Sequence, residues 1–261
     1  GAIYNTLSYK RWTWYAEYAL KSNEAIQNIA GKLIDASGSV IFSTLGYSKK
    51  GIGIIGQYKR VENYDLRVNP DQILLKGMLN YLPPLTRQNT YRLTSRYAAA
   101  CLPLGEEAFQ IDIVTKPRKG LNIDINVSHV RDLEGGILFN EIYVESKIKV
   151  NKKLKIIPGM QYMEYNRQAY ENKGGMIYTT TPFLETIYKL SRKKSIRTEW
   201  SYQHTKQDFG SWAWALLEYN VAPNWSFSIS DMYNIKPKKG DKLHYPSVFA
   251  GYTNKGNRYT L

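Results

Sequence analysis

The sequence of 261 residues has one cysteine, three histidines and no long apolar run. The single Cys101 excludes an intramolecular disulfide. His129, His204 and His244 are far apart, and none belongs to a C-x-x-C or H-E-x-x-H pattern, so we expect no metal site. No stretch of 18 consecutive apolar residues occurs, which excludes a transmembrane helix.

Aromatic residues are plentiful by contrast, with 22 Tyr, 6 Trp and 7 Phe. Amphipathic aromatics in such numbers suit a surface that meets a membrane–water interface. The mean hydropathy of −0.46 does not argue against this, because strands that span a membrane alternate apolar and polar residues and give no hydropathy peak.

Apolar and polar residues alternate with a period of two along most of the chain, which predicts β-strands. The clearest case is residues 121–128. There the residues expected to face lipid are Leu121, Ile123, Ile125 and Val127. The residues expected to face a polar lumen, here and in two later strands, are Asn122, Asp124, Asn126, Glu141, Glu145, Arg197 and Glu199. Glu24 to Ile34 is the best helix candidate, and we expect it to be a loop helix.

Connections of two lengths separate these strands. The short ones are residues 9–11, 48–51, 151–153, 191–194, 222–224 and 254–257, and the long ones are residues 22–37, 62–89, 167–175 and 235–243. Strands of about 9 to 11 residues are long enough to cross a bilayer. Short turns on one side and longer loops on the other are typical of outer-membrane barrels.

The predicted fold is therefore all-β: an antiparallel up-and-down transmembrane β-barrel of roughly 14 or more strands. Residues 1–261 form a single domain, which we expect to continue beyond both ends. The short and long connections stop alternating between Glu62 and Asn151, which indicates an uncounted strand or absent residues, with Lys116–Gly120 and Arg131–Gly136 as the places to look. Residues 62–89, which include Pro83-Pro84, are a loop or a plug that folds inward.

Aromatic residues gather near the predicted strand ends rather than in mid-strand. Belts at two membrane interfaces would produce this distribution. The aromatics expected at the interfaces include Trp12, Trp14, Trp212 and Trp225.

Patterns that suggest other functions lack the context that they need. Gly51 to Gly56 matches the dinucleotide-binding G-x-G-x-x-G, but Gln57 to Val61 continues an extended alternation where a helix must begin. Ser201, His204 and Asp208 share one short stretch and do not converge as a catalytic triad does. The net charge of +14 is spread over turns, without the basic patch and interleaved aromatics of a nucleic-acid site. We therefore expect no catalytic residues, no cofactor and no nucleic-acid partner.

Three segments carry a family resemblance: KQDFGSWAWALLEYNVAPNWSFSISDMYN at 206–234, NYLPPLTRQNTYRL at 80–93 and GEEAFQIDI at 105–113. They resemble a family of outer-membrane barrel proteins from Bacteroidota known only as a domain of unknown function. The resemblance implies a fold and a location, the bacterial outer membrane, and no activity.

Two functions fit these observations. The first is a non-enzymatic scaffold or accessory subunit of a larger outer-membrane complex for protein assembly, secretion or transport. Its partners would be outer-membrane lipid and other outer-membrane or periplasmic proteins. The stretch from Trp212 to Tyr219, apolar on both faces, favours this function. The alternative is a stand-alone porin-like channel for small solutes. A soluble all-β protein is a third interpretation, because alternation alone does not separate a sandwich from a barrel.

Overall fold

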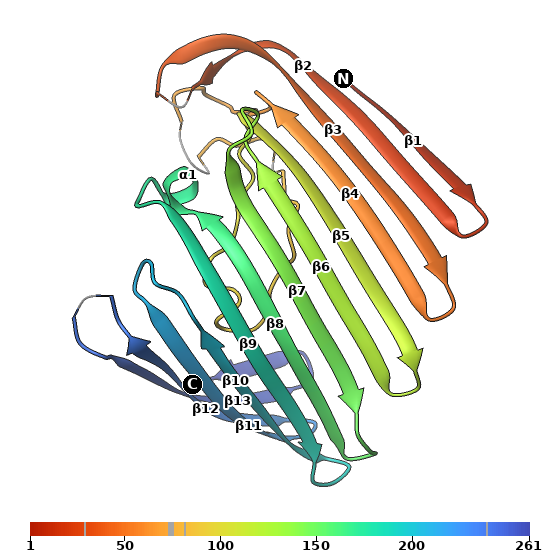
Figure 1. The fold of residues 1–261 in the computed structure, drawn as a ribbon, viewed down its shortest axis with the longest axis vertical. Helices are drawn as coiled ribbons and strands as arrows, with labels where there is room; N and C mark the ends of the chain where they lie inside the picture. The colour runs from red at the N-terminus through yellow and green to blue at the C-terminus, as the bar shows by residue number, and fades with distance from the viewer. Residues whose placement is uncertain (29, 73–75, 81, 239) are drawn as a thin grey trace.

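The computed structural model describes residues 1–261 except 29, 73–75, 81 and 239. The described residues form one antiparallel sheet of 14 strands, in which each strand pairs with the next along the chain (Figure 1). The strands are β1 (Ala2–Tyr9), β2 (Trp12–Gln27), β3 (Leu33–Lys49), β4 (Ile52–Glu62), β5 (Gly105–Arg118), β6 (Leu121–Arg131), β7 (Ile137–Lys149), β8 (Leu154–Asn166), β9 (Met176–Lys189), β10 (Lys194–Gln203), β11 (Ser211–Val221), β12 (Trp225–Lys236), β13 (His244–Asn254) and β14 (Asn257–Thr260). The prediction of an all-β, up-and-down fold with about 14 strands is confirmed.

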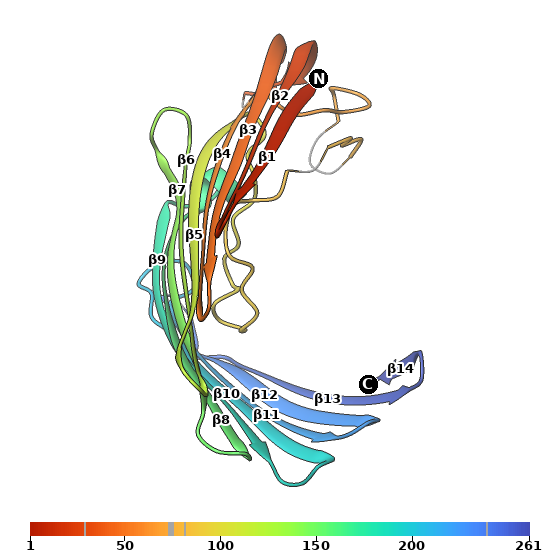
Figure 2. The same cartoon turned by 90° about the vertical axis from the view of Figure 1, so that its right-hand side faces the viewer.

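The sheet curves into a deep trough with one concave and one convex face (Figure 2). Among the described residues no strand pairing joins β1 to β14, so the trough has two free edges. The described residues of the segment between β4 and β5, residues 63–104, run along the concave face (Figures 1 and 2).

The alternating sequence sorts side chains onto these two faces. On β6, Asn126 and Ser128 are buried on the concave side, whereas Val127 between them is exposed on the convex side. The sheet register continues this division, since Val127 lies opposite Ile111 on β5 and Ile142 on β7. The main buried cluster includes Leu85, Tyr97 and Val130, so the core lies between the concave face and segment 63–104, which we call the covering segment.

All seven connections that follow an odd-numbered strand lie at one end of the sheet and are short. Four of them are two-residue turns at 10–11, 50–51, 119–120 and 255–256. Gly51 and Gly120 have φ of 83° and 82°, as such hairpin turns require. This arrangement explains why short and long connections stop alternating in the sequence between Glu62 and Asn151. Residues 116–120 hold a tight hairpin turn at the short-hairpin end, whereas the connection at 132–136 lies at the other end of the sheet.

The expectation of a loop helix at residues 24–34 is wrong. β2 and β3 continue as a paired hairpin through this stretch, with Ile26 opposite Ile34 and Ile26 buried. Burying one face of an alternating pattern outweighs the weak helical propensity of so short a segment. The described residues do form a short helix, α1 (Arg167–Glu171), in the predicted link 167–175. In the described part of the chain, no helix has the length and apolar character to span a membrane.

Candidate functional site: the concave face and its covering segment

The covering segment, residues 63–104, contacts the concave side of the strands from β2 to β11. Its partners there are Lys21, Val40, Lys59, Glu106, Asp124, Glu141, Gln161, Phe183, Gln203 and Trp212. The predicted plug range 62–89 overlaps this segment, although Glu62 is the last residue of β4 and residues 73–75 and 81 lie outside the described part of the chain. The long connection extends 15 residues further than the sequence indicated, to Leu104.

A buried ion pair holds this segment at two points, Pro83 and Leu102. Lys59 on β4 and Glu106 on β5 lie 2.8 Å apart, and both side chains are almost fully buried. Lys59 Nζ also donates to the Pro83 carbonyl at 2.6 Å, and the Leu102 amide donates to Glu106 Oε2 at 2.6 Å. A buried charge is tolerated when it is paired and hydrogen-bonded in this way.

Cys101 lies beside this ion pair, with its Sγ 3.5 Å from Lys59 Nζ. Burial, followed by the nearby Glu106 carboxylate, raises the pKa of the thiol to about 12. The thiol is therefore neutral and poorly nucleophilic at neutral pH.

Polar and aromatic contacts hold the middle of the segment. The Arg87 guanidinium lies 4.0 Å from the centre of the Tyr143 ring and 3.4 Å from Asp124 Oδ1. Asn89 donates to Glu141, and the Tyr91 and Phe183 rings pack with centroids 4.3 Å apart. These contacts supply hydrogen-bond donors to carboxylates of the concave face, among which Glu141 also accepts from Gln161.

Arg96 and Tyr97 fix the later part of the segment to β10, β11 and the loop between them. Arg96 donates to Gln203 Oε1 at 2.7 Å and stacks over the Trp212 ring at 4.8 Å. The Tyr97 hydroxyl donates to Asp208 at 2.7 Å, and burial together with that carboxylate raises the pKa of the phenol. Asp208 also accepts from Arg167 at 2.6 Å, which ties α1 to the same point.

The residues that the sequence assigned to the lumen lie on the concave face. Asn126, Glu141, Glu145 and Glu199 are buried there, Asp124 and Arg197 are partly buried, and Asn122 is exposed. The structure brings Arg197 and Glu199 together at 2.8 Å, and Arg197 also reaches Glu185 at 3.2 Å. The sequence did not single out the arginines of the covering segment. The sequence feature that could have identified them is the run TRQNTYRLTSRY at 86–97. It places three arginines in a link between strands that are rich in Glu.

The residues assigned to lipid, Leu121, Ile123, Ile125 and Val127, lie on the convex face. Of the four aromatics assigned to interfaces, Trp12, Trp14 and Trp225 are exposed on that face. Trp212 differs. It is 6% exposed and lies on the concave face opposite Gln203, because β11 presents its even-numbered residues inward and Arg96 covers the indole ring.

Aromatic side chains form two bands on the convex face, one near each end of the strands. Near the short hairpins, Trp12 packs on Tyr47 and Trp225 packs on Tyr252, with ring centroids 4.7 and 4.5 Å apart. Near the long loops, Tyr58 packs on Phe109 at 4.8 Å. β9 contributes to both bands, through Tyr178 and Tyr188. Apolar side chains such as Ile111, Ile142 and Met160 lie between the bands and are exposed.

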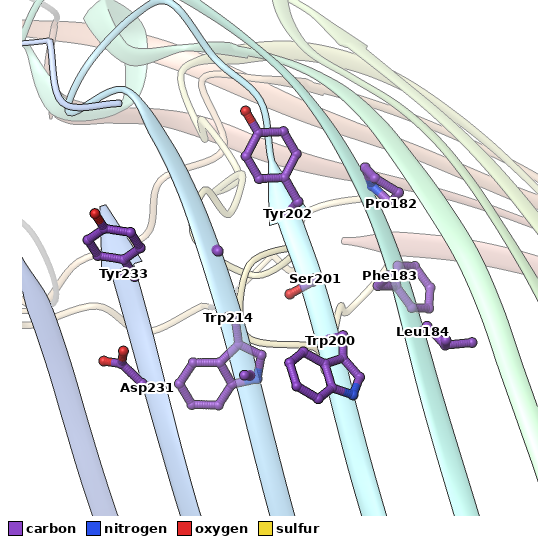
Figure 3. Close-up of a pocket in the computed structure, with 11 residues that line it drawn as sticks. Pro182, Phe183, Leu184, Trp200, Ser201, Tyr202, Trp214, Asp231 and Tyr233 are labelled. Carbon is purple, nitrogen blue, oxygen red and sulfur yellow. The ribbon is translucent and has the colours of Figure 1, made fainter. Parts of the chain in front are cut away.

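The convex face is hollowed over β9 to β12 by a cavity of about 440 Å³ (Figure 3). Ala213 and Ala215 of β11 form its floor because their small side chains lie between the larger Trp200 and Tyr202 of β10 and Tyr233 of β12. Asp231 lies at its border and accepts from His244 at 2.6 Å and from the Tyr245 amide at 3.1 Å. A cavity with a floor of small residues and a carboxylate at its border differs from the continuous apolar surface beside it.

The described residues contain no cluster of three or more His, Cys, Asp and Glu side chains placed to hold a metal ion. Ser201 lies on the concave face of β10, and His204 is exposed beyond the end of that strand. The stretch 52–56 of the G-x-G-x-x-G pattern is part of strand β4.

The molecule is thus a single curved antiparallel sheet whose concave face is covered by a segment of its own chain. It belongs to a family of unknown function, DUF6029, whose model matches residues 3–261. No curated protein matches the chain significantly.

Proposed function

We propose that this chain is an integral β-barrel protein of a bacterial outer membrane. In this proposal it acts without enzymatic activity as a scaffold or accessory subunit of a larger membrane complex. The observation that carries the proposal is the covered concave face: segment 63–104 contacts the strands from β2 to β11 where an open channel would need water. The resemblance to outer-membrane barrels of Bacteroidota supports the same location.

The spacing of the aromatic bands supports a membrane position. Tyr178 and Tyr188 are ten residues apart on β9, which is about 33 Å along a strand at about 3.3 Å per residue. With a strand tilt of about 40°, the separation along the membrane normal is about 25 Å, the usual height of the apolar band in outer-membrane barrels.

The two free edges need partners if the sheet is to lie in a bilayer. Hydrocarbon offers no hydrogen bonds to unpaired backbone groups, so only a closed sheet is stable there. In the proposed assembly, further strands therefore pair with β1 and β14 and close the barrel.

The hollow over β11 is the surface that favours a protein partner. Small residues let another backbone approach closely within a membrane, and Asp231 offers a hydrogen-bond acceptor that lipid tails cannot use. A photo-crosslinking residue at Ala215 should therefore trap a partner protein. The same residue at Val127, in the uninterrupted apolar band, should trap only lipid.

Purification of the tagged protein from native membranes in mild detergent tests the proposed role. We expect outer-membrane or periplasmic proteins to co-elute in stoichiometric amounts, as identified by mass spectrometry. Elution of the barrel alone, with ion conductance in a planar bilayer, would favour the alternative, a porin-like channel, in which the covering segment leaves the lumen.

A further inference from the structure

The short hairpins form a strongly basic rim at one end of the sheet. The rim comprises residues 9–12, 48–51, 116–120, 149–155, 189–194, 222–224 and 254–258. In chain order these connections hold two, two, three, four, four, no and two Lys or Arg, which is 17 of the 36 in the chain, and none of its 22 Asp and Glu. The loops at the other end carry both signs, with Asp132, Glu171, Asp208 and Asp241 among them.

The cations of this basic rim are available to a ligand. Among the described residues, none of the 17 forms an ion pair, whereas Lys59, Arg87 and Arg197, which lie between the sheet and the covering segment or beside it, are paired. The hairpins after β5 and β7 border a groove of about 600 Å³ lined by eight lysines, and seven of these belong to the rim. A second groove of about 500 Å³, between the hairpins after β7 and β9, includes Lys152, Arg192 and Lys193. This arrangement favours an anionic partner along the whole basic rim.

The position of the basic rim next to an aromatic band indicates which anion it meets. On the convex face the strand ends beside these hairpins carry Trp12, Tyr47, Tyr188, Tyr219, Trp225 and Tyr252. Aromatic side chains at strand ends mark the depth of lipid head groups, and cations just beyond them lie where lipid phosphates are. An acidic protein would need one compact patch, whereas these cations are distributed over six of the seven hairpins.

We propose that the basic rim binds the phosphates of anionic phospholipids in the leaflet at the short-hairpin end. The barrel is thereby oriented and surrounded by anionic lipid on that side only. This inference rests on the proposed membrane location, and it adds a lipid class and a leaflet to it.

Reconstitution of the full chain with spin-labelled lipids tests this proposal. The protein is inserted into phosphatidylcholine vesicles, and insertion is first checked by resistance to carbonate extraction. Binding of spin-labelled phosphatidylglycerol is then compared with that of spin-labelled phosphatidylcholine. We expect a preference for phosphatidylglycerol of about threefold or more, since each cation near the surface attracts anionic lipid. The preference should fall at 1 M salt, where the screening length is about 3 Å.

Two quadruple variants with the same change in charge locate the binding surface. Lys152→Gln, Lys153→Gln, Arg192→Gln and Lys193→Gln remove exposed rim cations, and the preference should drop by at least half. Lys173→Gln, Lys206→Gln, Lys238→Gln and Lys242→Gln remove exposed cations at the other end and should leave it unchanged.

The outcomes separate this proposal from the one on which it rests. Failure to insert into vesicles would contradict the membrane location. Insertion with no preference, with an equal loss in both variants or with a preference that resists 1 M salt would overturn the lipid proposal alone. Insertion without preference, combined with binding of soluble polyglutamate that only the rim variant loses, would indicate an acidic protein partner instead.

Discussion

The Tyr97 hydroxyl donates a hydrogen bond to Asp208 Oδ2 across 2.7 Å, and this contact joins the covering segment to the loop after β10. Asp208 also accepts from Arg167 and is itself almost fully buried. One carboxylate thus holds the segment, α1 and a loop of the long-loop end together.

Replacing this carboxylate should loosen the segment. We expect Asp208→Asn to cost about 1 to 3 kcal/mol, because the buried charge-assisted bonds to Tyr97 and Arg167 become neutral or are lost. Asn also tolerates the φ of 51° at this position, so the backbone is preserved. Amide hydrogen exchange should accelerate in residues 91–99 and 205–210. Unchanged exchange there would show that the segment is held elsewhere.

Cys101 provides a second probe of the packing of the covering segment, beside the Lys59–Glu106 ion pair. Its pKa of about 12 lies above the value of about 8.5 for an unfolded cysteine, so folding favours the protonated thiol. The contribution of the neutral Cys101 thiol to the free energy of folding is therefore fully present below about pH 8. It is lost as the pH rises toward about 12. Maleimide labelling at pH 8 should be slow in the folded protein and fast in urea. A Lys10→Cys variant with Cys101→Ser, in an exposed turn, should label quickly in both states.

The assignment of the two faces predicts opposite effects of arginine on β6. Ile125→Arg places a charge in the middle of the apolar band and should cost about 2 to 4 kcal/mol in a urea titration of vesicle-inserted protein. Asn122→Arg, at an exposed position on the concave face, should be tolerated. Equal losses in the two variants would refute the assignment.

The covering segment should determine conductance. Exchange of residues 63–104 for a short Gly/Ser linker should open an ion path in a planar bilayer, and the parent chain should not conduct. Because removal of the Lys59 and Glu106 contacts could prevent folding, Arg87→Gln with Arg96→Gln is a milder test that should give brief openings. A parent chain that already conducts steadily would contradict a closed lumen.

Period-two alternation was sufficient to predict the strands and their two faces, as on β6, because it records directly which side chains lie on which side of a sheet. It could not predict the contacts of the covering segment. Arg87 and Arg96 meet Asp124 and Gln203, which are 37 and 107 residues away, and local patterns carry no information on such pairing. The burial of Trp212 was missed for the same reason, since a tryptophan near a strand end suits an interface equally well until its face is known.

Accessibility along β9 tests the central claim, that this sheet spans a membrane. Single cysteines from Tyr178 to Tyr188, in a Cys101→Ser background and carrying spin labels, would be exposed to oxygen and to a water-soluble nickel chelate in vesicles. We predict that convex positions such as Thr180, Leu184 and Thr186 are accessible to oxygen and shielded from nickel, while the buried Thr179, Thr181 and Glu185 between them are accessible to neither. If the convex positions were as open to nickel as Arg192 in the exposed turn, the sheet would face water and the account would be wrong.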